Sequence, residues 1–406
     1  MLAPSSVLSQ DPTRHFDAIC ASSGNAIFRR MYFNRVATFL ISIAAFGSAQ
    51  AVSLDDLKDP EDGRFDTSRF LLDLKGFLPV PIIVTEPAVG YGGGAALVFF
   101  QRNEPTADRP GKSTPPDITA IAGMATENGT RGGGVGHLGF SRDGNWRYSA
   151  GAGKASVNVA FYGDALLPGA SGSQATDVNL EAKAAVVDVR RRVMGSDWFA
   201  GLRYLRADVA SRLRRDDDAQ VPPRDADTTL ASLAVIVEYD GRDNIFTPSS
   251  GSRLTFRGYD FGEAWGGERE FRRYEAAFNT FGSPVPRLVL GGRADYKAVT
   301  GDAPFYTLPF IQLRGVPAMR YQGDRTAVLE AEGRYDLDGR WSVVAFAGGG
   351  RAWRDGEGIG GTPTRWAGGL GFRYLVARLL GLHAGLDVAR GPEDTAVYIT
   401  VGSYWR

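Results

Sequence analysis

The sequence predicts an all-β fold, a transmembrane antiparallel β-barrel of about sixteen strands with one loop inserted into its lumen. Three observations predict this fold. Segments of alternating apolar and polar residues recur along the chain, and an export signal precedes them. After that signal, no apolar run is long enough for a membrane-spanning helix.

The clearest of these segments is Val328–Leu337. Its apolar and charged residues alternate, with Leu329, Ala331, Gly333, Tyr335 and Leu337 on one parity and Glu330, Glu332, Arg334 and Asp336 on the other. A strand directs successive side chains to opposite faces. Charged side chains facing a dry core would carry a large desolvation cost, so the segment indicates a wall between lipid and a wet lumen. The same alternation recurs at 178–186, 274–278 and 288–298.

Residues 1–51 have the pattern of a signal peptide region. Arg29, Arg30 and Arg35 precede an apolar run from Val36 to Phe46, and Ala49-Gln50-Ala51 forms a small-residue cleavage site. The run is shorter than the roughly 20 apolar residues that a membrane-spanning helix needs. Met31 could be the true start. We therefore expect an exported mature chain that begins at Val52.

The composition excludes several classes of function. Lys plus Arg number 46 and Asp plus Glu number 46, so no net charge favours nucleic acid as a partner. The only cysteine, Cys20, lies in the expected signal peptide region, which leaves the mature chain without disulfides, thiol nucleophiles or Cys-ligated zinc. We expect no metal and no cofactor.

From Phe77 onward the chain divides into segments of about ten residues, the length that a tilted spanning strand needs. The predicted strands are 77–86, 90–101, 116–127, 131–141, 145–157, 174–190, 197–210, 226–240, 251–262, 269–282, 287–299, 325–337, 341–354, 364–376, 380–389 and 395–405. Residues 77–406 would form the outer-membrane barrel, and 52–76 a short periplasmic segment before it. Tight links such as 337–340 and 390–394 contrast with longer ones at 103–116, 164–175 and 212–225, which predicts short turns at one end and long loops at the other.

One connection, Thr300–Asp324, is too apolar for a solvated loop. A structureless loop of this length needs a physical reason, and folding into the lumen would shelter its apolar residues. Arg314 would then be buried and would need a carboxylate partner.

Several motifs in this part of the chain resemble the Omp85 superfamily, which includes BamA, TamA and the bacterial surface antigen D15 proteins. Leu313-Arg314-Gly315-Val316, then Tyr321-Gln322-Gly323-Asp324 and a strand with Glu332, resembles that family's lumen-inserted loop. Residues 239–251 look like its turn into a mid-barrel strand, and 368–374 with 386–393 look like its last strands. The resemblance covers essentially 77–406 and implies the lumen-loop residues Leu313, Arg314, Gly315, Tyr321, Gly323 and Asp324.

The sequence departs from the family pattern in two respects. The segment 52–76 is too short for a periplasmic POTRA domain, so the resemblance implies a member without POTRA domains. Many members carry Phe-x-Asp-x-Gly on the strand that receives the loop arginine, but this chain has Gly348 where the acid would be. The candidate partners of Arg314 are therefore Glu332, the first choice, and Asp387.

The resemblance implies protein insertion, secretion or lipid handling at a Gram-negative-type outer membrane. Outer-membrane lipids and client outer-membrane or exported proteins would be the partners. The first and last strands, from Phe77 and up to Trp405, would pair weakly and form a seam that opens sideways. Trp405 followed by Arg406 is a near match to the terminal aromatic that usually signals assembly.

Two other classes of function stay open. One is a passive pore, and the other is an outer-membrane hydrolase, which would need a histidine near a serine. His137 and His383 are the only histidines after the signal peptide region, and no nucleophile elbow accompanies either. The sequence thus favours a protein that is not an enzyme, and it names neither a client nor an oligomeric state.

Overall fold

The computed structural model describes residues 57–73, 78–86, 88–101, 103, 115–162, 175–213 and 227–405. The chain divides into two compact units, and the described residues all belong to the second, Leu54–Arg406. The expected signal peptide region 1–51, with Met31, and the seam residue Phe77 lie outside the described residues.

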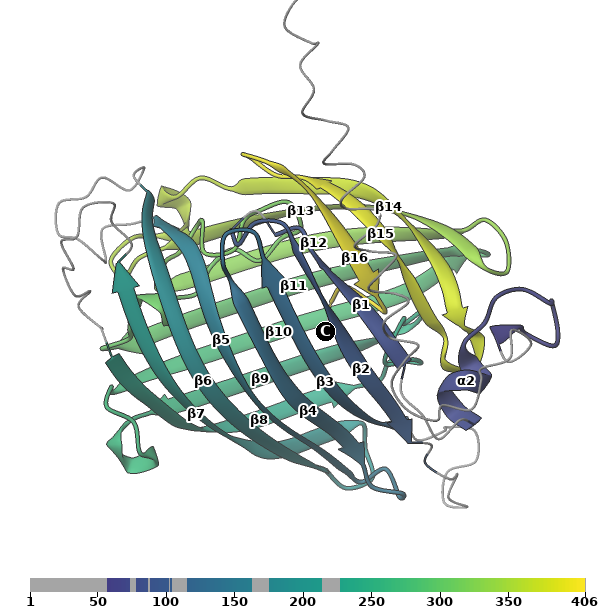
Figure 1. The fold of residues 1–406 in the computed structure, drawn as a ribbon, viewed down its shortest axis with the longest axis horizontal. Helices are drawn as coiled ribbons and strands as arrows, with labels where there is room; N and C mark the ends of the chain where they lie inside the picture. The colour runs from purple at the N-terminus through teal and green to yellow at the C-terminus, as the bar shows by residue number, and fades with distance from the viewer. Residues whose placement is uncertain are drawn as a thin grey trace, which may run out of the picture. The chain divides into compact units, whose positions relative to one another are not determined.

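Sixteen strands form one sheet in which each strand is hydrogen-bonded to the next in sequence order (Figure 1). All the pairings are antiparallel. This confirms the predicted fold class. The strands are β1 Leu78–Val84, β2 Gly92–Gln101, β3 Asp117–Thr126, β4 Arg131–Phe140, β5 Trp146–Tyr162, β6 Ala175–Arg192, β7 Trp198–Leu213, β8 Asp227–Asp240, β9 Gly251–Phe261, β10 Phe271–Val285, β11 Leu288–Gly301, β12 Arg325–Asp336, β13 Trp341–Trp353, β14 Arg365–Ala377, β15 Leu382–Arg390 and β16 Thr395–Val401.

The sheet curls until its first and last strands lie side by side (Figure 1). Among the described residues, no ladder of hydrogen bonds joins β1 to β16. We call this junction the seam.

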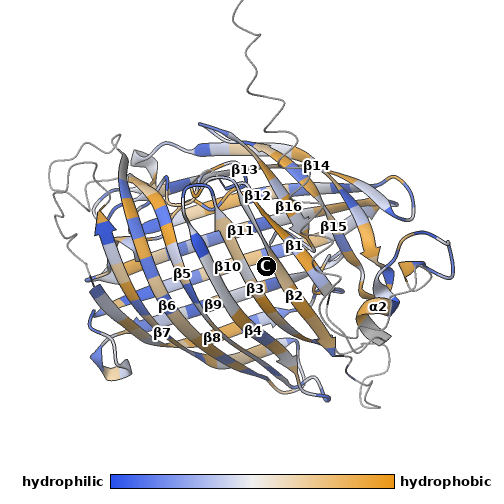
Figure 2. Ribbon diagram, viewed as in Figure 1, coloured by the Kyte–Doolittle hydropathy of each residue, from blue (hydrophilic) through white to orange (hydrophobic). Residues whose placement is uncertain are grey.

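The strand β12 has two different faces, as its alternating sequence predicts, and Figure 2 shows where hydrophobic and hydrophilic residues lie on the strands. In β12, Leu329 is 66% exposed on the outer face, whereas Glu330 is 5% exposed on the inner face. Leu329 and Tyr335 are the exposed large residues on the outer face of this strand, and an apolar outer face is the arrangement of a barrel wall in contact with lipid.

Because consecutive strands run in opposite directions, alternate connections lie at the same end of the barrel. We call the end that holds the β12–β13 turn the turn end, and the end that holds the β11–β12 loop the loop end. Two connections depart from the predicted asymmetry. The long β2–β3 link is at the turn end, and the tight β15–β16 link is at the loop end.

The last strand is shorter than predicted, because β16 ends at Val401 and not at Trp405. Gly402 has φ +78, a left-handed conformation that turns the chain away from the strand. The residues after it, Ser403 to Trp405, form a tail. The buried Trp405 side chain belongs to this tail and not to β16.

A short segment ahead of the barrel, residues 57–73, ends in the helix α2, Ser68–Asp73. The buried Leu71 packs with Ala377, Leu380 and Leu382, which belong to the β14–β15 turn and its flanking strands. We call residues 57–73 the strap. No helix in the described part of the chain has the length and apolar character needed to cross a membrane.

Candidate functional site

The loop between β11 and β12 folds back on itself into the barrel. Phe310 and Gln322 form an isolated antiparallel bridge, and Ile311 N donates to Tyr321 O at 3.0 Å. At the tip, Val316 N donates to Leu313 O at 3.1 Å and Gly315 has φ +89. A positive φ at the third residue is the mark of a type II turn, in which glycine is favoured. The motif Leu313-Arg314-Gly315-Val316 therefore presents Arg314 on a tight turn.

The loop packs against β12 and β13 through glycines. Ile311, Leu313, Val316 and Val328 form a buried apolar cluster. A Cβ atom at Gly348 would lie 2.9 Å from Leu313 Cδ2, and one at Gly350 would lie 2.6 Å from Ile311 Cγ2. Both distances are shorter than van der Waals contact, and a Cβ at Gly348 would also lie 2.7 Å from the backbone oxygen of Leu329, so a larger residue at 348 or 350 would force the surrounding atoms to shift. An acid at position 348 is incompatible with this packing.

Arg314 is fully buried and is bound by carboxylates from two strands. Its Nη2 is 2.7 Å from Glu330 Oε1 and 2.7 Å from Glu332 Oε2, and its Nη1 is 2.9 Å from Asp387 Oδ2. The guanidinium also lies over the Phe346 ring, 3.5 Å from its centroid, and 4.7 Å from the centroid of Tyr404. Charge-assisted hydrogen bonds and cation–π contacts together offset the cost of burying this charge.

Glu330 joins three parts of the molecule. Its Oε1 accepts from the loop residue Arg314, and its Oε2 accepts from Trp405 Nε1 of the tail at 2.8 Å and lies 3.2 Å from Arg293 Nη1 of β11. Asp387 is shared in a similar way between Arg314 and Arg373, whose Nη1 is 2.6 Å from it. We call the group of Arg314, Glu330, Glu332 and Asp387 the lumen cluster.

The loop contacts the chain on both sides of the seam. Gly315 N donates to the hydroxyl of Tyr398 in β16 at 2.9 Å, and Ala318 N donates to Glu86 Oε1, two residues after the end of β1, at 2.9 Å. Burial raises the pKa of Glu86 above its usual value. The tip of the loop is therefore held both by the last strand and by the connection that follows the first.

The structure places the predicted lumen-loop residues in two groups. Arg314 meets Glu332 and Asp387 in the lumen cluster, with Leu313 and Gly315 beside it. Tyr321, Gly323 and Asp324 lie at the base of the loop. Tyr321 donates its hydroxyl proton to Glu393, Gly323 N donates to Pro309 O at 3.1 Å, and Asp324 Oδ2 accepts from Asp355 N at 2.8 Å.

Sequence reasoning missed Glu330, which makes two of the hydrogen bonds to Arg314. Glu330 is directly opposite Gly348 in the β12–β13 ladder, so the acid absent from β13 is supplied by the neighbouring strand. The register of the tight hairpin at 337–340 was the signal that could have revealed it. The lumen position of Trp405 was also missed, because it depends on the turn at Gly402.

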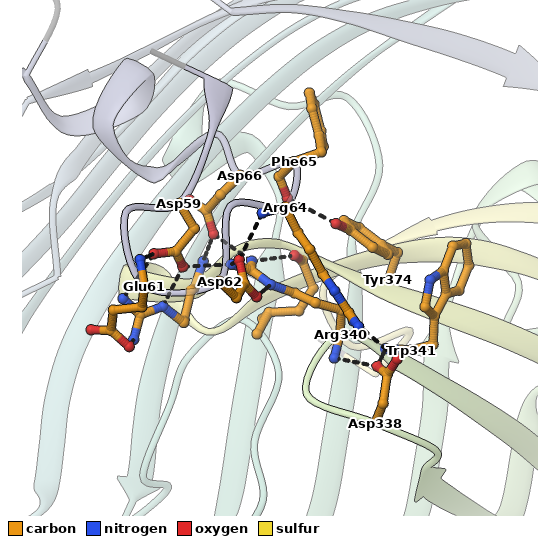
Figure 3. Close-up of polar contacts among 12 residues, drawn as sticks. Asp59, Glu61, Asp62, Arg64, Phe65, Asp66, Asp338, Arg340, Trp341 and Tyr374 are labelled. Carbon is orange, nitrogen blue, oxygen red and sulfur yellow. Dashed lines mark hydrogen bonds and ion pairs between the residues drawn. The ribbon is translucent and has the colours of Figure 1, made fainter. Parts of the chain in front are cut away.

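A second ionic cluster holds the strap at the turn end (Figure 3). Arg340, from the β12–β13 turn, is fully buried. It lies 2.5 Å from Asp59, 2.7 Å from Asp62 and 2.6 Å from Asp66. Arg378, in the β14–β15 turn, lies 2.5 Å from Asp59. The strap is thus tied by its carboxylates to two turns of the barrel, and α2 also packs beside Phe100 of β2 and Val401 of β16, on either side of the seam.

Acid should release the strap. The hydrogen bond from Arg340 lowers the pKa of Asp62 to about 2, and backbone hydrogen bonds from Trp341 and Arg340 lower that of Asp338 to about 2. Because these pKa values are depressed in the folded state, their stabilisation is present above the usual value of 3.8 and is lost as the pH falls towards 2. We expect pepsin to cut within 57–73 much faster at pH 2 than at pH 4, after correction with a reporter peptide. Equal protection at both pH values would contradict this.

The histidines show no catalytic arrangement among the described residues. His383 Nδ1 is buried without a hydrogen-bond partner there, and His137 Nδ1 bonds to Thr119 Oγ1 at 2.8 Å on the outer face. No group of His, Cys, Asp and Glu in the described ranges could hold a metal ion.

No protein-family model and no curated protein matches this sequence. Solved outer-membrane barrels do match the structure. BamA from Haemophilus ducreyi, lacking POTRA domains 1–3, has a TM-score of 0.51 at 10% identity over 80% of this chain and 68% of its own. CdiB from Escherichia coli has a TM-score of 0.55 at 14% identity, and CdiB from Acinetobacter baumannii one of 0.50 at 10%. This chain spans 61% and 59% of those two CdiB chains. The likeness to BamA and CdiB confirms the expected barrel fold.

Proposed function

We propose that this chain is an outer-membrane barrel of the Omp85 type, whose seam opens to insert or translocate client proteins. The observation that carries the proposal is the seam itself. Its two strands lie side by side without a hydrogen-bonded ladder in the described residues, and the lumen loop contacts both sides.

Three features weaken pairing across the seam. The seam strands β1 and β16 have seven residues each, fewer than any other described strand. Pro79 and Pro81 remove two N–H donors from β1. The turn at Gly402 withdraws the rest of the chain from β16. An unpaired strand edge is a template for an incoming strand, which is the chemistry that insertion of a β-barrel client requires.

Locking the seam with a disulfide tests the proposal. In a Cys20→Ser background, cysteines at Val80 or Ile82 of β1 would be combined in turn with cysteines at Ile399 or Val401 of β16. Cells that depend on such a variant are expected to lose folded outer-membrane proteins under oxidising conditions and to recover them with a reductant. A control pair at Ala200 and Val237, partners in the β7–β8 ladder, should have no effect.

If depletion of the protein leaves the outer-membrane protein and lipid profiles unchanged, the transport proposal is wrong. A passive pore is the second candidate, because the barrel encloses charged inner walls. The loop argues against it, since Arg314 and its partners occupy the lumen. A hydrolase would be supported only by ester or peptide turnover that His383→Ala abolishes.

A further inference from the structure

A cavity of about 680 Å³ lies inside the barrel at the turn end, away from the lumen cluster. One side of it is formed by β1 to β4 and the other by β5, β6, β8 and β9. Phe100, Phe246, Leu382 and Val401 line the cavity and also pack in the apolar cluster around α2, so the strap lies beside its mouth.

The wall made by β1 to β4 is apolar on both faces. Its outer face carries Ile83, Phe99, Ile121 and Val135, which are 53%, 37%, 51% and 49% exposed. Its inner face also carries large apolar side chains, which line the cavity: Val80, Ile82, Val98, Phe100, Ile118 and Leu138. An inner wall in contact with water is ordinarily polar, so this stretch is suited to an apolar occupant.

The opposite wall carries an excess of positive charge. Five guanidinium groups (Arg147, Arg190, Arg203, Arg242 and Arg253) share three carboxylates (Asp188, Glu238 and Asp240), which leaves two positive charges in excess. Glu238 alone is within 2.8 Å of Arg147 and Arg190 and within 2.7 Å of Arg253. All of these groups except Arg203 line the cavity, so the lining itself has four guanidinium groups against three carboxylates, one positive charge in excess.

Three of these arginines have hydrogen-bond donors that the ion pairs do not use. Arg147 bonds only through Nη1, and Arg242 and Arg253 bond through Nε and Nη2. Nη2 of Arg147 and Nη1 of Arg242 and Arg253 therefore have no acceptor among the described residues. Guanidinium groups bind phosphate oxygens with matched geometry, so a phosphate could engage these donors without breaking the existing ion pairs.

We propose that this cavity binds an anionic membrane lipid, with an acyl chain along the inner face of β1 to β4 and the phosphate against the arginine wall. Its volume lies within the range of roughly 300–1,000 Å³ typical of small-molecule sites. Val80 of β1 and Ile399 of β16 both line it, so the cavity adjoins the seam. The inference concerns binding alone and does not depend on whether the seam opens for client proteins.

The experiment uses the full chain, purified in a neutral detergent and titrated with phosphatidylglycerol or phosphatidylcholine under native mass spectrometry. We expect phosphatidylglycerol to bind at least about ten-fold more tightly than phosphatidylcholine. The phosphate of either lipid can accept charged hydrogen bonds from the arginines, but only phosphatidylglycerol carries a net negative charge that the positive wall attracts. Arg242→Gln should weaken phosphatidylglycerol binding about ten-fold, because it removes the one positive charge that the cavity lining has in excess. Asp240 keeps Arg147 at 2.9 Å in that variant, so no carboxylate is left unpaired.

Ala96→Phe, on the inner face of β2 opposite Val80, should block both lipids by filling the apolar half. Arg206→Gln is the matched control, since it removes the same charge from an exposed pair near the loop end. The heat-modifiable migration of each variant in gel electrophoresis tests whether it is folded. If Ala96→Phe is not folded, Ala120→Phe is used in its place.

Two results would overturn the inference. Equal binding of both lipids, unchanged by Arg242→Gln and Ala96→Phe, would mean that lipid binds only to the outer surface. Displacement of phosphatidylglycerol by millimolar inorganic phosphate would mean a simple anion site.

Discussion

Arg314→Ala is expected to detach the lumen loop. The substitution removes the cation that joins Glu330, Glu332 and Asp387. Glu330 keeps Arg293 and Asp387 keeps Arg373, but Glu332 loses its ion pair and nothing then ties the tip of the loop to these carboxylates. Removing one partner of a buried ion pair costs about 3–5 kcal/mol where the other charge is left uncompensated, which is an upper bound here because two of the three carboxylates keep a cation. The loop should therefore leave the lumen, with a larger single-channel conductance in planar bilayers and faster proteolysis within 302–324.

Two variants calibrate this result. Arg325→Ala removes an exposed ion pair with Asp355 near the base of the same loop, and a pair of that kind contributes about 0–1 kcal/mol. Its conductance should match that of the unmodified protein. Arg314→Lys keeps the charge but not the planar fork, so we expect an intermediate conductance. A large conductance that Arg314→Ala leaves unchanged would instead favour the passive pore.

An independent substitution displaces the same loop without altering any charge. A Cβ at Gly350 would lie 2.6 Å from Ile311 Cγ2 and 3.2 Å from Val328 Cγ2. Gly350→Val should thus raise the conductance in the same direction as Arg314→Ala, because the side chain occupies space that the loop fills. Agreement between the two variants would assign the effect to the loop and not to the lost charge.

Arg340→Ala is expected to release the strap. Arg340 is the buried cation that joins Asp59, Asp62 and Asp66, and it also donates to the Leu375 carbonyl at 3.1 Å. Without it, the ion pairs of Arg378 with Asp59 and Glu61 are the only side-chain ion pairs between the strap's carboxylates and the barrel among the described residues. Loss of several charged hydrogen bonds should increase proteolysis within 57–73 by more than about ten-fold at neutral pH.

The matched control for the strap is Arg64→Ala. Arg64 belongs to the same segment and pairs with Asp338 at 3.0 Å, but both side chains are about half exposed, at 50% and 43%. Its loss should change the cleavage rate little. If Arg340→Ala and Arg64→Ala behave alike, the buried cluster does not hold the strap, and the expected release by acid would fail with it.

The fold could be predicted because the alternation of apolar and polar residues that marks a barrel strand lies within the strand's own sequence. Alternation in β12, from Leu329 to Asp336, follows from the pleat and needs no knowledge of neighbouring strands. The apolar loop with Arg314 was predictable for a similar reason, since a buried arginine requires carboxylate partners wherever it lies. Strand ends were less well predicted: β5 runs to Tyr162, five residues beyond the predicted end at 157.

The choice among carboxylates could not be predicted from one strand alone. Glu330 and Glu332 have the same parity, so alternation places both on the inner face. Only the register with β13, which sets Glu330 opposite Gly348, and the glycines that admit the loop bring Glu330 into two bonds with Arg314. Glu332 was the first choice, and the structure has it share Arg314 with Glu330 and Asp387.

By itself, the sequence determined that this chain forms a barrel of about sixteen strands, several of them with an apolar and a polar face, and that its apolar loop carries one arginine into the lumen. Those properties are local, because a strand's faces depend only on its own residues. The tertiary structure alone decided three others: the contacts of the loop on both sides of the seam, the return of Trp405 to Glu330, and the arginine wall facing an apolar one. Each of these joins residues far apart in the chain, and their meeting depends on how the sheet curls and where single turns direct the backbone.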